Sequence, residues 1–419
     1  ELDSLGGIHI LTGAIEVDRL TVSNNSTTIL TGSIEIHTHL ELDEAIIDAT
    51  GGELRLTQGQ FGRATVRRTN GGEVRGEVTR VLQLPATPNS QFWLNYPLTY
   101  QIFSIGLEGV TLSELTDDFP TTGFVGSDDP SADPNIGYKD ETVSGGGLAH
   151  FANATDTLPV WRAIQVNLPI QNEIEVEFSG TLPSASNTYD VTSSDAGNVG
   201  FNWLGNANNS GMDIMQFSNQ IGVNSAMKCW NTESLRWDLY IDGYSTNGMG
   251  GYVEPNEVCQ IQFDADQSIP FVGDHEVRSF EKASIAQNES HLAKAVFGLR
   301  NASGFSDEAI LTVKENASFG MEFDEDVLNH FGQLDACDLF VEHGGAKYGI
   351  SQVGFEGKAI LEATLRYSGF QPIDNLFTIE VSELELGDYC GFIQFEGETD
   401  VLPLENGLTR DFQLTNATY

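Results

Sequence analysis

The sequence predicts an all-β chain in which a short N-terminal parallel β-solenoid precedes two antiparallel β-sandwich domains. Three observations support this fold class. The 419 residues include 44 Gly and 13 Pro with 40% apolar residues, which is typical of cores built from strands joined by turns. An internal repeat occupies the N-terminal region, and short strand-like segments separated by turn-forming clusters follow it. A chain of this length is expected to form two or three domains.

The repeat predicts a β-solenoid over residues 1–62. Ile10–Val17 has the sequence ILTGAIEV, and Ile29–Ile36, 19 positions later, has the sequence ILTGSIEI. A third copy follows at Thr50 (TGGELRL), with its apolar register displaced by one residue. A short period of strand and turn is what a parallel solenoid requires, because each coil covers the apolar face of the next. The glycine after each threonine is expected to provide a corner with positive φ. A meander of hairpins is the alternative.

Two antiparallel sandwiches are expected at residues 63–272 and 273–419, with the boundary marked by Pro270 and Gly273. The main strands expected in the first are Val74–Leu84, Ala163–Leu168, Ile174–Phe178, Val199–Leu204, Leu235–Ile241 and Val258–Phe263. Those expected in the second are Ala295–Arg300, Glu308–Val313, Lys358–Tyr367, Leu376–Val381 and Tyr389–Phe395.

The charge balance is strongly acidic, with 20 Lys and Arg against 61 Asp and Glu and a net charge of −41. Such a surface repels phosphate backbones, which argues against nucleic acid as a partner. Solubility in salty water explains the charge, and Ca²⁺ binding is the functional alternative. The candidate calcium ligands are Asp128, Asp129 and Asp133, in a loop rich in turn residues. A solvated acidic loop is the competing interpretation.

The four cysteines suggest two local disulfides, Cys229–Cys259 and Cys337–Cys390, one in each sandwich. Disulfides would place the chain in an oxidising, extracellular compartment, and four free thiols are the alternative. No stretch reaches the roughly 18 apolar residues that a membrane-spanning helix needs.

Catalytic motifs are missing from the sequence, which contains neither G-x-S-x-G nor H-E-x-x-H. We therefore expect no enzymatic activity. His37 and His39, two apart on an expected strand, could share a face and bind a metal, although a polar solenoid face accounts for both. Aromatic side chains could stack on sugars if exposed, and core packing is the alternative. The aromatic candidates are Trp93, Tyr96, Tyr100, Trp161, Trp203, Trp230 and Trp237.

Several segments carry a resemblance to known surface modules. They include ATVRR (64–68), GFVGSDDP (123–130), GFNWLGNANNSGMDI (200–214) and FGLRNASGFSDEAILTV (297–313). Together with the closing segment 387–419, they resemble large surface proteins exported by the type IX secretion system of Bacteroidetes, in which β-solenoid and β-sandwich modules precede a sorting domain. The resemblance covers most of the chain and includes no catalytic residues. It implies an extracellular location on a bacterial cell surface.

These features together predict a structural or adhesive surface protein, with self-assembly into a fibre as a further expectation. The first coil is expected to leave its apolar stacking surface open, and the last sandwich is expected to be one strand short. Residues Phe412, Leu414 and Tyr419 would then take part in end-to-end contacts between copies. A chain that continues past both ends is the alternative. The competing functional class is a carbohydrate-binding or accessory region of a larger secreted enzyme, with a surface glycan as partner.

Overall fold

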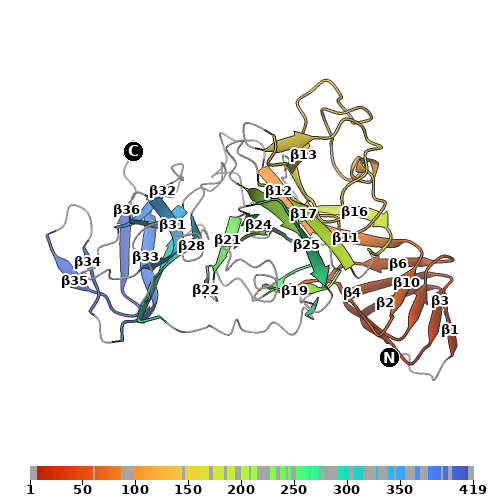
Figure 1. Cartoon of the computed structure of the whole chain (residues 1–419), viewed down its shortest axis with the longest axis horizontal. Helices are drawn as coiled ribbons and strands as arrows, with labels where there is room; N and C mark the ends of the chain where they lie inside the picture. The colour runs from red at the N-terminus through yellow and green to blue at the C-terminus, as the bar shows by residue number, and fades with distance from the viewer. Residues whose placement is uncertain are drawn as a thin grey trace.

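The structure is a computed structural model of the 419-residue chain, and it is all-β, with 62% of the described residues in strands and 2% in helices. It describes residues 7–59, 62–85, 99–143, 147–168, 173–183, 186–193, 200–206, 209–214, 227–232, 236–241, 244–246, 252–263, 265–272, 276–277, 291–301, 306–314, 327–328, 338–343, 346–353, 364–368, 376–387, 390–394 and 399–413. The strands form several separate sheets, with parallel pairing concentrated at the N-terminal end (Figure 1).

Two sheets of mainly parallel strands make up the N-terminal region, which we call the parallel stack (residues 8–84). The first sheet has the order β1 (Ile8–Leu11), β3 (Thr27–Leu30), β5 (Ile46–Asp48) and β10 (Glu73–Arg75). The second has the order β2 (Ala14–Val22), β4 (Ser33–Asp43), β6 (Glu53–Leu56), β11 (Val78–Leu84) and β16 (Ile174–Gly180), and β9 (Thr65–Thr69) also pairs with β4. A small hairpin joins β7 (Gln58–Gly59) to β8 (Gly62–Arg63). Within the second sheet, β16 is antiparallel to β11.

The sequence repeat corresponds to the register of the parallel strands. Ile10 lies beside Ile29, and Ile15 lies beside Ile34, each pair 19 positions apart. Ile34 then lies beside Leu54, one position further along, as the displaced third copy predicts. The parallel pairing continues through β9, β10 and β11, so residue 62 does not interrupt the stack.

Glycine is needed at the corners of the stack for two different reasons. Gly13 has φ of 84°, the positive value expected there. Gly32 and Gly51, which follow the other two threonines, do not have the expected positive φ, and neither does Gly52. A Cβ atom on Gly32 would instead collide with the backbone of Gly13, and one on Gly52 with the backbone of Gly32. Close approach of successive coils therefore excludes side chains at Gly32 and Gly52.

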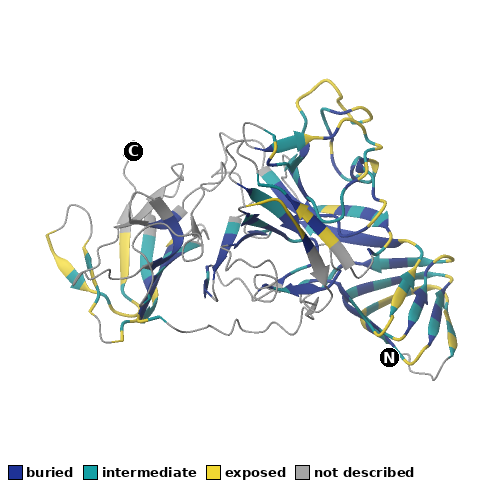
Figure 2. Ribbon diagram, viewed as in Figure 1, coloured by how far each residue is buried: buried dark blue, intermediate teal, exposed yellow. Residues whose placement is uncertain are grey.

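A single hydrophobic core extends from the parallel stack into the segment that follows it. Alternate residues of the parallel strands point inward, as the alternation of burial along them shows (Figure 2). The same core contains Phe103, Ile136 and Phe178. The following segment has a 3-10 helix, η1 (Leu112–Leu115), and an antiparallel sheet of order β12 (Thr99–Ser104), β15 (Ala163–Leu168), β13 (Ile136–Lys139) and β14 (Leu148–His150).

Antiparallel sheets form the middle of the molecule around a second core. The largest has the order β18 (Phe201–Gly205), β24 (Val258–Gln262), β20 (Met227–Asn231), β21 (Arg236–Ile241) and β22 (Tyr244–Ser245). Two smaller sheets pair β19 (Gly211–Asp213) with β23 (Tyr252–Val253) and β26 (Glu276–Val277), and β17 (Ser186–Val191) with β25 (Gln267–Val272). Tyr189, Cys229 and Phe263 are among the residues of this core.

The C-terminal region is an eight-stranded sheet. Its order is β32 (Thr364–Ser368), β30 (Asp338–His343), β31 (Ala346–Val353), β28 (Ser306–Val313), β27 (Ala293–Asn301), β33 (Leu376–Glu385) and β36 (Thr409–Gln413), with β29 (Val327–Leu328) beside β31. The β28–β31 pair is parallel, which an antiparallel sandwich does not predict. A separate hairpin joins β34 (Phe392–Gln394) to β35 (Val401–Pro403).

The C-terminal sheet contacts the middle sheet through a small apolar cluster that includes Leu239 and Tyr244 on one side and Ile310 and Ile350 on the other. Beside the cluster, His291 Nδ1 lies 2.8 Å from the Tyr244 hydroxyl, and His291 Nε2 lies 2.8 Å from the Glu385 carboxylate. The parallel stack and the C-terminal sheet consequently lie at opposite ends of the long axis (Figure 1).

Candidate functional site

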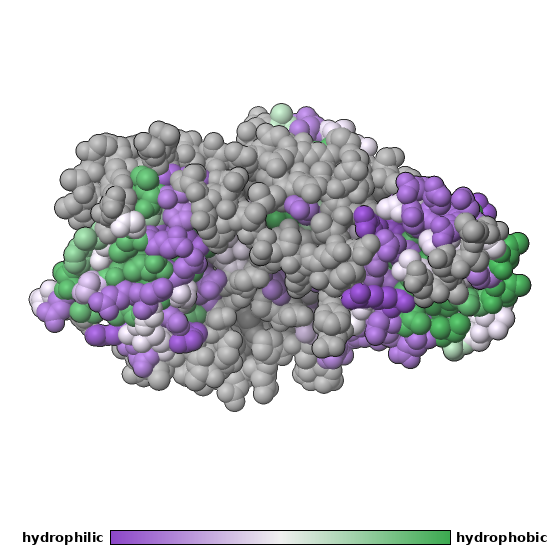
Figure 3. All heavy atoms as spheres, turned by 90° about the horizontal axis from the view of Figure 1, so that it is seen from below, coloured by the Kyte–Doolittle hydropathy of each residue, from purple (hydrophilic) through white to green (hydrophobic). Residues whose placement is uncertain are grey.

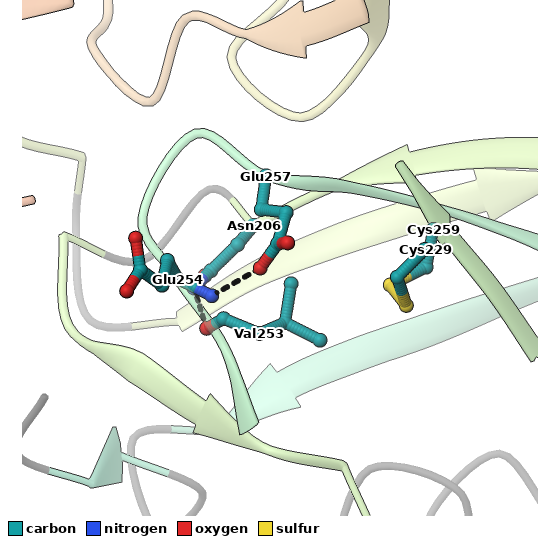
Figure 4. Close-up of a disulfide and its surroundings, with 6 residues drawn as sticks. All are labelled: Asn206, Cys229, Val253, Glu254, Glu257 and Cys259. Carbon is teal, nitrogen blue, oxygen red and sulfur yellow. Dashed lines mark hydrogen bonds between the residues drawn. A yellow bond between two sulfur atoms is a disulfide. The ribbon is translucent and has the colours of Figure 1, made fainter. Parts of the chain in front are cut away.

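The segment 200–214, one of those that carry the resemblance, lies where the parallel stack meets the middle sheets. The Asn206 amide donates hydrogen bonds to the carbonyls of Ser210 (2.8 Å) and Val253 (3.0 Å), as Figure 4 shows in part. The Asn209 amide donates to the Gly106 carbonyl (2.8 Å), and its oxygen accepts from Arg80 (2.6 Å). Both buried amides satisfy backbone carbonyls, and the bonds of Asn209 to Gly106 and Arg80 join the two regions.

Two buried arginines complete this junction. Arg63 donates to the Pro255 carbonyl (2.9 Å) and to the Thr232 hydroxyl (3.1 Å), and Arg80 donates to the Ala64 carbonyl (2.6 Å). Burial lowers the pKa of Arg80, and the nearby charge of Arg63 lowers it further. Their donors bind backbone oxygens and neutral side chains, which is a structural use of arginine.

Glu257 is the acidic group of the junction. Burial raises the pKa of its carboxyl, the neighbouring Glu254 raises it further, and Arg63 acts in the opposite direction. The carboxylate accepts a hydrogen bond of 2.7 Å from the backbone N–H of Glu254 (Figure 4). A shifted acid can mark a catalytic site. Here it closes a turn, and the amides and arginines around it are bonded to the protein itself.

One disulfide is present among the described residues. Cys229 on β20 and Cys259 on β24 are register partners in the middle sheet, and both are buried (Figure 4). Cys390 is exposed and forms no disulfide with another described residue. Its expected partner, Cys337, lies outside the described residues, so the Cys337–Cys390 disulfide stays a prediction.

The expected calcium loop does not gather its three carboxylates. Asp128 accepts a hydrogen bond of 2.9 Å from the backbone N–H of Thr121, and Asp129 accepts one of 3.0 Å from the backbone N–H of Ser131. The bonds from Ser131 lower the pKa of Asp129. Among the described residues, Asp128, Asp129 and Asp133 do not bring ligand atoms within 4.8 Å of one another as a group of three. Asp128 and Asp129 stabilise turns, and calcium binding stays a prediction.

His37 and His39 do not share a site. The His37 side chain is 20% exposed, with Nε2 lying 2.9 Å from Glu16 Oε1 and Nδ1 lying 3.8 Å from Glu35 Oε1. His39 is buried and lies 2.7 Å from the Thr65 hydroxyl. The register shift between β2 and β4 at Val17 disrupts the simple alternation that would place both rings on one face.

The described aromatic residues pack against one another. Trp230 is fully buried, with ring centroids of Tyr100 and Trp237 at 4.9 and 5.4 Å. Trp203 lies 5.6 Å from Trp237, and Trp161 packs against Tyr189 at 5.5 Å. None of these rings is among the exposed large apolar side chains of the described residues, and Trp93 and Tyr96 lie outside them. Trp230 is a core residue with half-buried rings around it, which is typical of core packing, and sugar stacking stays a prediction.

A polar hollow lies beside η1 and β16, and sequence reasoning missed it. It is lined by Ser113, Glu114, Asp117, Asp118, Glu177 and Ser179. Burial raises the pKa of Asp118 to about 6, and the nearby acids oppose its ionisation further. Glu177 is bound on its other side by Arg55 through two contacts of 2.8 Å. No motif marks these acids, because 61 similar residues occur in the chain.

Exposed apolar side chains gather at the two ends of the molecule. Ile8 and Ile10 on β1 are 71% and 63% exposed, and Phe392 and Val401 on the β34–β35 hairpin are 63% and 56% exposed. Apolar surface is visible at both extremes of the long axis (Figure 3). Phe412 lies on β36, at an edge of the C-terminal sheet, whereas Leu414 and Tyr419 lie outside the described residues.

In the described part of the chain, no helix has the length and apolarity needed to cross a bilayer. Comparisons with protein-family models, with curated proteins and with solved structures find no match to this chain. The resemblance to type IX surface proteins accordingly remains a prediction from the sequence segments that carry it.

Proposed function

We propose that this chain is a non-enzymatic structural or adhesive protein of a bacterial cell surface, whose copies associate end to end. In this proposal the parallel stack is a short β-solenoid, and the antiparallel sheets that follow are sandwich modules of an elongated subunit. The observation that carries it is the position of the exposed apolar side chains at opposite ends of the molecule. Four of the six exposed large apolar side chains of the described residues lie there.

The strand edges at the two ends support the same association. Among the described strands, β1 and β2 are the outermost of their sheets at the N-terminal end, and β36 is outermost in the C-terminal sheet. Outer strands have unpaired backbone groups that can pair with another chain. Contacts between two different surfaces do not close on themselves, so repetition produces a fibre. An acidic subunit would assemble more readily as salt screens the repulsion between copies.

End-blocked variants test this proposal. Wild-type protein should grow in size with concentration by light scattering, and Ile8→Lys with Ile10→Lys should stop the growth. Phe392→Lys with Val401→Lys should stop it as well. A mixture of the two double variants should form dimers and nothing larger, because each retains one intact end. Val125→Lys is the matched control, since Val125 is 66% exposed away from both ends. Wild-type protein that stays monomeric at every attainable concentration would overturn the proposal.

Carbohydrate binding is the competing function, and the aromatic cluster is its strongest support. The indole N–H groups of Trp203 and Trp230 are buried with no acceptor among the described residues, so they could donate to a sugar hydroxyl only if the cluster opened. The mutual packing of the rings favours the structural function instead. Glycan-array binding by the wild type that is lost in Trp237→Ala, with folding retained, would favour the carbohydrate-binding alternative.

A further inference from the structure

Three potential metal ligands meet on the outer face of the parallel stack. Glu16 on β2 lies directly beside Glu35 on β4, and His37 follows Glu35 two residues later. One ligand atom from each of the three lies within 4.8 Å of those of the other two, and this is the only such group of three among the described residues. His37 Nε2 is 2.9 Å from Glu16 Oε1. The group therefore has the dimensions of a small metal site.

The repeat and one irregularity bring these residues together. Glu16 and Glu35 occupy the same position in ILTGAIEV and ILTGSIEI, so in-register stacking places the two carboxylates side by side. Beyond them, Val17 pairs with Ile36 but Arg19 pairs with His39, so β4 contains one extra residue. This bulge separates His37, at the surface, from the buried His39.

The local charges leave the paired carboxylates undercompensated. Like charges directly opposite on neighbouring strands are unfavourable. The guanidinium of Arg55, on the neighbouring strand β6, makes two contacts of 2.8 Å with Glu177 and one of 3.0 Å with Glu53. Only its Nε approaches Glu35, at 3.9 Å. Arg55 thus serves Glu177 and Glu53 more closely than Glu35, and a cation between Glu16 and Glu35 would relieve their repulsion.

Thr57 holds the histidine ring in an orientation that suits metal binding. Its hydroxyl lies 2.7 Å from His37 Nδ1 and 3.4 Å from the Ile36 carbonyl. The hydroxyl can accept the Nδ1 proton while donating its own hydrogen to that carbonyl. Nε2 then presents its lone pair toward Glu16. Such a second contact to a ligating histidine is a common feature of metal sites.

We propose that Glu16, Glu35 and His37 bind a divalent zinc-class metal ion. One imidazole and two carboxylates form a ligand set typical of Zn²⁺, with a fourth position left for water. Ca²⁺ is a poorer fit, because it requires six to eight oxygen ligands. The site does not depend on end-to-end association. Its main competitor is a proton, because metal ligands must be deprotonated before they bind the ion.

Calorimetric titration of the metal-stripped 419-residue chain with ZnCl₂ at pH 7.5 tests the site. We expect one saturable site that is insensitive to calcium and weakens as the pH is lowered, because protons compete with the metal for its ligands. His37→Gln should reduce the affinity at least about tenfold, and Thr57→Val should reduce it by about 10-fold or more. His150→Gln is the matched control, since His150 is exposed and lies away from the group.

A second variant keeps the result interpretable. Glu16 is 75% exposed, so Glu16→Gln should leave folding intact while weakening zinc binding several-fold. Zinc-dependent melting should follow the same order, since a ligand that binds only the folded state raises its stability. Zinc affinity that is unchanged in His37→Gln, or a wild type without saturable binding, would overturn the proposal. A pH-dependent loss of stability in His37→Gln with unchanged zinc affinity would likewise identify a simple ion pair.

Discussion

The parallel stack and the C-terminal sheet differ in the sequence separation between their paired strands. In the stack, Ile10 pairs with Ile29 and Ile34 with Leu54, so neighbours in space are one repeat apart in sequence. In the C-terminal sheet, Lys294 pairs with Glu385, far along the chain. Local pairing costs little loop entropy, whereas distant pairing must be fixed by packing or by covalent links. The strand register of the first coils can therefore be predicted from the sequence repeat, whereas the register of the later sheets cannot.

Their means of stabilisation differ in the same way. The stack depends on close contact between successive backbones, which excludes side chains at Gly32 and Gly52. The middle sheets contain a buried disulfide and a network of buried amides and arginines. A substitution that affects only the backbone contacts of the stack, or only the disulfide of the middle sheets, should therefore change the stability of one region more than that of the other.

The largest effect is expected from removing the disulfide. Replacing both Cys229 and Cys259 with Ala should lower the stability of the middle sheets by about 3–4 kcal/mol, because the bond closes a loop of 30 residues. Urea unfolding followed by tryptophan fluorescence should report the loss, since all five Trp lie outside the stack. Amide hydrogen exchange in β2, β4 and β6 should change little. Equal losses of protection in both regions would mean that they unfold as one unit.

A smaller effect should come from one methyl group placed in each region. Gly32→Ala should destabilise the stack by about 2–3 kcal/mol, because the new Cβ would collide with the backbone of Gly13. Gly298→Ala on β27 is the matched comparison, since nothing lies within 4 Å of the new Cβ and φ is not positive there. It should stabilise by roughly 0.5 kcal/mol. Thermal unfolding of both variants checks the pair, and similar shifts would show that backbone contact does not distinguish the regions.

The sequence predicts the all-β class, the register of the first coils and the Cys229–Cys259 disulfide. It does not reveal that the stack extends to β11, because the later coils lack the octet seen at Ile10 and Ile29. The parallel pairing of β28 with β31 could not be predicted either, because the alternation of apolar residues along a strand does not indicate whether its neighbour runs parallel or antiparallel.

Candidate sites were harder to predict than the fold. Asp128 and Asp129 lie close in sequence, but their side chains serve local turns. Glu16 and Glu35 belong to no ligand motif, although the repeat alone places them side by side. The bulge that separates His37 from His39 leaves no mark in the sequence. Adjacency across strands therefore matters more here than adjacency along the chain.

The smallest predicted effect concerns Asp118, at the η1–β16 contact that covers one end of the stack. Burial raises its pKa from 3.8 to about 6, so the folded state holds this proton more tightly than the unfolded state does. Below pH 3.8 Asp118 is protonated in both the folded and the unfolded state, so it does not lower the free energy of unfolding. As the pH rises from 3.8 to about 6, Asp118 lowers the free energy of unfolding progressively, and above pH 6 this loss is at its full value. Asp118→Asn should therefore stabilise the protein at pH 7, by about 1 kcal/mol after allowance for solvent screening of a half-buried group.

Asp156, whose pKa is lowered where that of Asp118 is raised, provides a comparison of opposite sign. Asp156 accepts hydrogen bonds from the backbone N–H groups of Asn153 (3.0 Å) and Ala152 (2.9 Å), which lower its pKa. Asp156→Asn should therefore destabilise at pH 7, and the difference from wild type should shrink as the pH falls through the lowered pKa. The gain from Asp118→Asn should instead fade between pH 6 and 4. Melting curves across this range measure both variants. A gain for Asp118→Asn that persisted unchanged at pH 4 would mean that the lost charge is not its cause, because both states are then largely protonated at that position.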